Sequence, residues 1–411
     1  MTEPVRITRR ALLVGGLAAA GTAAVGGTLL PLLDRGSVPT GRSAAARDRL
    51  LVVIEMAGGN DGPTMAVPTA DPLYRQLRRR TAVDPASTLA MADGVGLHPS
   101  LRRLHGRGVA VLRGVGVSQP DLSHFEMLRR LWLGDVSGRT ALATGFLGRL
   151  CDAVGDPAAP VVGVSVSTSP SLALASERVA TAALPGPEAS AIHPDDATLG
   201  PVWDSALRAM SQEDRAAADR TLNLARHANA GAMRLSSVLA GLPPASPGYP
   251  TKNDLGQQLS FTARLLAANV GVRVVHVPAS ADFDTHSGHL VRARTNLDML
   301  DAALGAFLDD LERRGLLSRT LVLTTSEFGR RAEDNADAGL DHGTASTWLL
   351  AGAARRGVHG EAPRLDRLDD DGNVRATVGF DEVYATVAEG WFGVPAGDVL
   401  PGSPRPLSGV L

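Results

Sequence analysis

Short apolar runs recur along this chain, each bounded by glycine or polar residues. They cover residues 50–56, 109–115, 160–166, 273–277, 320–325 and 347–350. Runs of this length without polar alternation are typical of strands buried on both faces, as in a parallel sheet. Leucines at spacings of three and four predict a helix over 293–314 that stops at Gly315 and leads into the next run. The pattern predicts an α/β fold with a mostly parallel central sheet flanked by helices.

The segment from about residue 203 to 270 contains no strand pattern. It is predicted to be helical on both sides of a proline-rich break at 241–251. Because the strand series resumes afterwards, we interpret it as an α-helical insertion within one domain spanning 47–411. The acidic stretch 366–374 lacks the spacing of a calcium-binding EF-hand loop, which favours a solvated turn.

The N-terminal residues are typical of an export signal. Arg9 and Arg10 precede an apolar stretch, 11–33, and then the small residues 43–46. This order predicts a twin-arginine signal peptide over 1–46, read by the twin-arginine export machinery, and a secreted, periplasmic or cell-envelope location. The alternative is a membrane anchor, since the stretch is long enough to span; an uncleaved signal would keep the protein at the membrane. Glycines and Pro31 within the stretch favour the cleaved signal.

Charge and cysteine content exclude two classes of protein. The net charge is −2, so no basic excess is present to neutralise phosphates, and we expect no nucleic-acid partner. Cys151 is the single cysteine, which excludes an internal disulfide framework. Lys252 is the single lysine, so a lysine nucleophile is not expected elsewhere.

Acidic residues and histidines follow several of the predicted strands. Asp61 lies in GGNDG after the first run, Asp284 and His286 in DTH after the run at 273–277, and Glu327 in SEFGRR after the run at 320–325. In open α/β sheets, ligands bind outside the carboxyl ends of the strands. These residues therefore predict a metal or acid–base site at that edge, although GGNDG alone also fits a plain turn.

Two motifs carry further candidate residues. Ser123 precedes a predicted helix, so it is either an N-cap or a nucleophile beside a site for an anion, with His124 next to it. Asp341 and His342 form an adjacent acid–imidazole pair beside glycine. Both side chains need polar partners, which favours a site over a packing role.

The DTH segment offers more than one set of ligands. Asp284 and His286 are predicted to bind a metal, with Asp282 and His289 as substitutes. A carboxylate with an imidazole suits zinc or manganese better than calcium; the alternative is that the histidines only cap a polar loop. Glu327 is a ligand, a general base or the partner of a nearby arginine, and Arg330 is a candidate clamp for an anion.

Seven motifs in order give the chain a family resemblance. They are GGNDG (58–62), HPSL (98–101), SHF (123–125), GFLGR (145–149), DTH (284–286), TTSEFGRR (324–331) and DHGTAS (341–346). The chain resembles the DUF1501 family, exported bacterial proteins of largely uncharacterised function. That family is similar to the alkaline phosphatase/sulfatase superfamily.

The resemblance implies one or two divalent metal ions, zinc or manganese, and a role for each motif. It implies metal ligation by Asp61, Asp284, His286, Glu327 and His342, and a nucleophilic Ser123. The superfamily has a histidine where this chain has Phe328, and Asp341 or His124 could replace it. Cys151 lies in no sulfatase nucleophile motif.

Two hypotheses follow. The first is a metal-dependent hydrolase of a phosphate or sulfate ester, either a small molecule or a polymer. The second is a catalytically reduced ligand-binding or assembly protein on the same fold.

Overall fold

A computed structural model describes residues 48–187, 199–211 and 220–411. The signal peptide predicted for residues 1–46 lies outside these residues. No helix in the described ranges combines the length and apolarity needed to cross a membrane.

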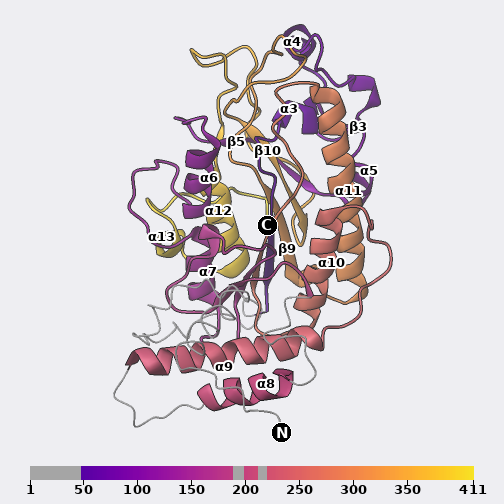
Figure 1. Cartoon of the computed structure of the whole chain (residues 1–411). Helices are drawn as coiled ribbons and strands as arrows, with labels where there is room; N and C mark the ends of the chain where they lie inside the picture. The colour runs from indigo at the N-terminus through magenta and orange to yellow at the C-terminus, as the bar shows by residue number, and fades with distance from the viewer. Residues whose placement is uncertain (1–47, 188–198, 212–219) are drawn as a thin grey trace.

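The described residues form one large sheet at the centre of the molecule (Figure 1). Its order is β11-β5-β10-β9-β1-β8-β6-β7, with β12 also paired to β5. The strands are β1 Leu50–Glu55, β5 Ala110–Gly116, β6 Gly163–Ser165, β7 Thr181–Ala183, β8 Val274–Pro278, β9 Thr320–Thr325, β10 Ser346–Gly352, β11 Gly357–His359 and β12 Val378–Gly379. Only β10, among these strands, runs antiparallel to its neighbours, so the mostly parallel sheet is confirmed.

The six predicted strands all occur, within a few residues of the expected bounds. The strands that the sequence did not reveal are short. They are β7, β11, β12 and a separate small sheet made of β2 Ala66–Pro68, β4 Val95–Leu97 and β3 Leu89–Ala90. Two or three residues are too few to produce a recognisable apolar pattern.

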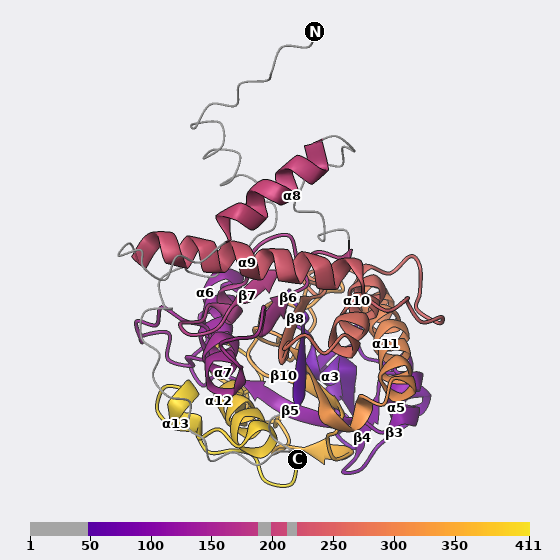
Figure 2. The same ribbon diagram turned by 90° about the horizontal axis from the view of Figure 1, so that it is seen from below.

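Helices cover both faces of the sheet, as Figures 1 and 2 show. One layer holds α5 Arg102–Arg107, α10 Asp254–Ala267 and α11 His289–Arg313; the other holds α6 His124–Leu133, α7 Phe146–Val154 and α12 Phe380–Ala385. Successive side chains of a strand point to opposite faces. In β1, Val52 and Ile54 therefore pack in the first layer and Leu51 and Val53 in the second. Burial on both sides explains why β1 reads as an unbroken apolar run.

The remaining elements are shorter or lie toward one end of the sheet. They are α3 Gly62–Met65, α4 Pro72–Leu77, α8 Leu199–Met210, α9 Arg220–Ala240, α13 Ala396–Val399, the 3₁₀ turns η2 Pro85–Ser87, η3 Leu172–Leu174 and η5 Leu317–Arg319, and the π-helical turn η6 Thr386–Phe392. Helices α8 and α9 cross the molecule at the bottom of Figure 1, whereas α10 packs along α11 in the layer on the sheet. The interpretation of 203–270 as an insertion stays a prediction.

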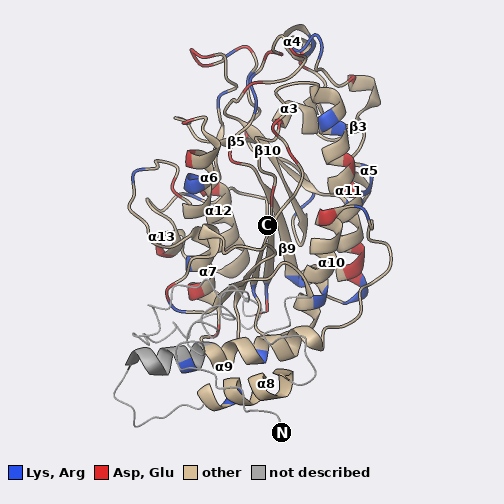
Figure 3. Cartoon of the chain, in the orientation of Figure 1, with Lys and Arg blue, Asp and Glu red and all other residues tan. Residues whose placement is uncertain are grey.

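Five chain segments meet at the carboxyl edge of the parallel strands. They follow β1, β5, β8 and β9, and the fifth precedes β10, whose reversed direction brings its start to the same edge. An isolated antiparallel bridge joins Arg330 to His342 there. Figure 3 shows acidic and basic residues interspersed along the helices that flank this edge. The fold thus collects the predicted site motifs in one place.

Candidate metal centre

A cluster of imidazoles and one carboxylate lies at this edge. His124, Asp284 and His342 each offer a ligand atom, and the three atoms lie within 4.8 Å of one another. His286 joins them: its Nε2 is 3.0 Å from Nε2 of His342 and 3.2 Å from Oδ1 of Asp284. His124 begins α6, Asp284 and His286 follow β8, and His342 precedes β10. The fold therefore brings together three segments that lie far apart in the sequence.

Each imidazole turns Nδ1 toward an oxygen that can only accept a hydrogen bond. The pairs are His124 with Oε1 of Glu327 at 2.7 Å, His342 with the carbonyl of Leu122 at 2.8 Å, and His286 with Oδ1 of Asp341 at 3.2 Å. Carboxylates and carbonyls accept, so Nδ1 must donate in each pair. A neutral ring then carries its lone pair on Nε2, and metal-binding histidines are oriented in this way.

This arrangement fits a divalent metal ion. Two Nε2 lone pairs only 3.0 Å apart repel each other unless a proton or a cation lies between them. Nε2 of His124 is buried and has no hydrogen-bond partner among the residues that the structure describes. Imidazole nitrogens with one carboxylate are a donor set that suits zinc or manganese. Within the described ranges this is the one group of its kind, which favours a single ion.

The protonation equilibria of the cluster are shifted in different directions. The hydrogen bond to Glu327 raises the pKa of His124 despite partial burial. Burial lowers the pKa of His342. Burial by itself would raise the pKa of Asp284, but the hydrogen bond and charge of Arg330 outweigh it, and the pKa lies below its ordinary value. At neutral pH the cluster therefore holds an ionised carboxylate beside a neutral His342.

Arg330 connects the loops around the cluster rather than facing solvent. Its side chain is fully buried, and it donates to the carbonyls of Gly59 at 2.9 Å and Leu340 at 2.8 Å and to Oδ1 of Asp284 at 2.5 Å. Its guanidinium also donates to the carbonyl of Gly58, so Arg330 holds these loops together, and its role as a clamp for a bound anion stays a prediction.

Asp61, predicted as a ligand, does not join the cluster. Its carboxylate receives two hydrogen bonds from the guanidinium of Arg78, at 2.5 and 2.8 Å, and one from the backbone N–H of Thr64 at 3.0 Å. Both Asp61 and Arg78 are buried. The carboxylate of Asp61 is thus paired with an arginine, and its role as a metal ligand stays a prediction. Arg78 lies in a run of three arginines, and nothing in the sequence marks it as this partner.

Glu327 and Asp341 lie behind the imidazoles. Glu327 is buried, and its Oε1 accepts from the N–H of Gly58 at 2.8 Å as well as from His124. Asp341 accepts from Nδ2 of Asn335 at 2.9 Å, a bond that lowers its pKa. Both carboxylates accept from Nδ1 of an imidazole, and their role as metal ligands stays a prediction. Spacing in the sequence could not separate these two roles.

The proposed substitute ligands lie elsewhere. Nε2 of His289 is 2.9 Å from the hydroxyl of Thr64, and its Nδ1 is 2.7 Å from the hydroxyl of Thr285. Asp282 forms an ion pair with Arg292 at 2.5 Å. Neither side chain belongs to the cluster.

Ser123 and Phe328 complete the surroundings. Ser123 is the N-cap of α6, as predicted, but its hydroxyl makes no capping hydrogen bond. The ring of Phe328 packs against the rings of His124 and His342, with centroids 4.8 and 4.7 Å apart. Phe328 therefore forms an apolar wall beside two imidazoles, and Ser123 lies next to His124 at the start of α6.

Comparison with solved structures finds distant likenesses. The lipoteichoic acid synthase LtaP from Listeria monocytogenes is 10% identical with a TM-score of 0.38, covering 93% of this chain and 79% of that chain. The PsFucS1 sulfatase from Pseudoalteromonas sp. is 12% identical with a TM-score of 0.36, and the match covers 98% of this chain and 78% of the sulfatase chain. The phosphonate monoester hydrolase of Agrobacterium radiobacter is 11% identical with a TM-score of 0.38, and the match covers 84% of this chain and 73% of the hydrolase chain.

Identities this low carry no information about a substrate. A comparison with curated proteins gave no match. Residues 48–387 match the family described as "Protein of unknown function (DUF1501)". This match spans most of the chain, and the protein belongs to the DUF1501 family.

Proposed function

We propose that this protein is an exported metal-dependent hydrolase of a phosphate or sulfate ester. One observation carries the proposal: three imidazoles present Nδ1 to acceptor oxygens and direct Nε2 toward Asp284. Burying nitrogen lone pairs without a hydrogen-bond donor lowers the stability of the fold unless a cation binds to them. The ester class comes from the motif resemblance, and export by the twin-arginine machinery comes from residues 1–46.

A bound divalent ion would supply Lewis-acid stabilisation of the charge that develops on the ester oxygens. His124, His342 and Asp284 would hold it, with His286 at the rim. Ser123, one residue before His124, is placed to be the nucleophile at the start of α6, where backbone N–H groups favour an anion. Its Oγ would lose a proton and bond to phosphorus or sulfur while the bond to the ester oxygen breaks, and that oxygen would take up a proton and leave as the alcohol. Water would then attack the phosphorus or sulfur, releasing phosphate or sulfate and restoring the serine hydroxyl.

The alternative, a ligand-binding or assembly protein, is favoured by one pair of features. Phe328 packs where the superfamily has a second imidazole, and Asp61 is held by Arg78. A second metal ion of the kind found in two-metal phosphatases would then lack ligands, and with it part of the charge stabilisation. This alternative predicts a protein that binds metal and does not hydrolyse esters.

Metal analysis after native export tests the proposal. Wild-type protein should hold about one equivalent of zinc or manganese, lost in Asp284→Ala and in His342→Ala. His105→Ala is the control, because His105 also bonds a backbone carbonyl but lies on α5, outside the cluster. Metal-free wild-type protein with an intact circular dichroism spectrum would contradict the metal centre.

Hydrolysis of p-nitrophenyl phosphate and p-nitrophenyl sulfate then separates the two functions. Ser123→Ala should keep the metal and lose hydrolysis. Hydrolysis that survives this change would remove the covalent role of Ser123 only. Wild-type protein that binds metal and hydrolyses neither ester would support the alternative.

A further inference from the structure

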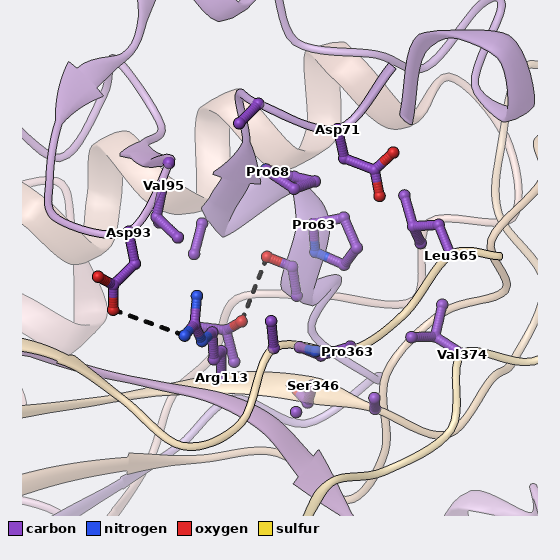
Figure 4. A pocket seen from close by; sticks show the side chains of 18 of the residues that line it. Pro63, Pro68, Asp71, Asp93, Val95, Arg113, Ser346, Pro363, Leu365 and Val374 are labelled. Carbon is purple, nitrogen blue, oxygen red and sulfur yellow. Dashed lines mark hydrogen bonds and ion pairs between the residues drawn. The ribbon is translucent and has the colours of Figure 1, made fainter. Parts of the chain in front are cut away.

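A cavity of about 350 Å³ borders the GGNDG loop at Gly62. Its walls are mainly aliphatic and include Pro63, Ala66, Pro68, Val95, Pro363 and Leu365 (Figure 4). The volume is at the lower end of the range for small-molecule sites, about 300–1,000 Å³. Proline-rich walls change little on binding, so the cavity has the character of a preformed site.

This cavity is distinct from the metal centre. None of the four residues His124, Asp284, His286 and His342 lines it. The GGNDG loop borders both sites: Gly62 lines the cavity and accepts from the hydroxyl of Thr347 at 3.3 Å, and Gly58 packs against the backbone of Asp284. The metal-centre chemistry does not account for an apolar cavity at this place.

Three charged side chains line the cavity, and two of them compensate each other. Arg113, largely buried on β5, forms an ion pair with Asp93 at 3.6 Å and donates to the carbonyl of Gly360 at 3.0 Å. In Figure 4, Asp71 lies across the cavity from Asp93. One of its oxygens accepts from the N–H of Leu73 at 2.9 Å, and its other oxygen has no protein partner in the described part of the chain. The uncompensated charge of the cavity is therefore a negative charge at Asp71.

We propose that this cavity binds a compact aliphatic ligand that carries one ammonium group. The aliphatic body contacts the proline and alanine walls, where burial of apolar surface supplies most of the affinity. The ammonium group donates to the free oxygen of Asp71, a half-buried carboxylate that its bond to Leu73 holds in place. A carboxylate ligand would compete with Asp93 for the guanidinium of Arg113, and it would also meet the negative charge of Asp71.

Three probes of nearly equal size test the proposal: cyclohexylamine, cyclohexanol and cyclohexanecarboxylate. Each is titrated into the full-length, metal-loaded protein and followed by amide chemical shifts in NMR spectra. Cyclohexylamine should bind about tenfold more tightly than cyclohexanol, the size expected for one charge-assisted hydrogen bond, and the carboxylate should bind most weakly.

Two variants define the site. Asp71→Asn should keep the cap of α4, because asparagine caps as well as aspartate, while removing the preference for the amine over the alcohol. Ala362→Trp, at an exposed position on the rim, should abolish binding of all three probes. Unchanged amine binding in either variant would overturn the proposal.

The remaining outcomes are also decisive. Tightest binding by the carboxylate, lost in Arg113→Gln, would make Arg113 the anchor and overturn the assignment of an ammonium ligand. Absence of binding by every probe would overturn the site itself. Esterase activity is not the readout, so failure of the proposed hydrolase function leaves this test intact.

Discussion

At the scale of single residues, Glu327 contacts the candidate centre only through His124. We expect Glu327→Gln to weaken metal binding by about ten- to a hundredfold, as is usual for carboxylates that orient a metal-binding imidazole. The fold should persist, because the amide oxygen can still accept from His124 and Gly58. Competition with a chromogenic chelator measures the affinity. Glu126→Gln, which removes a carboxylate paired with Arg129 on α6, is the control and should leave it unchanged.

Arg78 is the residue on which the buried charge of Asp61 depends. Arg78→Met leaves that carboxylate buried without a counter-charge, and we expect a loss of about 3–5 kcal/mol in the free energy of unfolding, measured in urea. The double variant Asp61→Asn/Arg78→Met should recover part of the loss, since it removes the unpaired charge. An equal loss in the single and double variants would show that packing, not charge, is responsible.

The same pair predicts a dependence of stability on pH. Burial alone would raise the pKa of Asp61, but the charge of Arg78 and the hydrogen bonds to the carboxylate place it below its ordinary value. A group with a depressed folded pKa stabilises the protein fully above its unfolded pKa, about 3.9, and loses that contribution as the pH falls further. Urea unfolding at pH 7 and pH 3 should show a larger loss in wild type than in Asp61→Asn/Arg78→Met.

The residue scale also shows what the sequence could reveal. Asp284, His286 and His342 can be singled out from the sequence because each lies next to an apolar run, after β8 for the first two and before β10 for His342. The pairing of Asp61 with Arg78 was missed, because it joins side chains whose meeting depends on the course of the intervening chain. Spacing leaves His124 and Asp341 as alternative replacements for the missing imidazole, because residue spacing contains no distances between segments.

At the scale of elements, the loop after β1 packs against the loop after β8. Gly58 has φ +111, and a Cβ there would lie 2.4 Å from the backbone nitrogen of Asp284. We expect Gly58→Ala to cost about 1–3 kcal/mol in stability, from strain, and to weaken metal binding by displacing Asp284. Gly106→Ala on α5 is the control: nothing lies within 4 Å, and alanine should stabilise the helix slightly. Unchanged metal affinity in Gly58→Ala would contradict the coupling of the two loops.

Helix boundaries depended on local backbone geometry. The helix predicted for 293–314 begins earlier, at His289, because Gly288 takes a left-handed conformation and acts as its N-cap. Its end agrees with the prediction: Gly315 has φ +69 and its N–H bonds the carbonyl of Glu312. Leucine periodicity defines the buried face of a helix, but in the first turn Leu290 and Val291 are exposed and His289 is buried, so that turn does not continue the pattern.

At the scale of the whole molecule, the candidate centre connects loops from different parts of the sheet. A metal that binds only the folded chain stabilises it by about 2.7 kcal/mol at a hundredfold excess over Kd. We therefore expect zinc or manganese to raise the unfolding temperature of wild type and of His105→Ala by several degrees in calorimetry, and not that of Asp284→Asn. An equal rise in all three would show that the metal binds elsewhere.

The antiparallel strand β10 has a consequence for biosynthesis. It lies between β5 and β9, although the ribosome releases it after both. Until residue 352 has emerged, β5 and β9 have no strand to join them, and a nascent chain also lacks His342 just ahead of β10. His124 and His342 are separated by more than half of the 411 residues. Binding of a metal ion by the nascent chain would therefore show that β10 has already paired with β5 and β9.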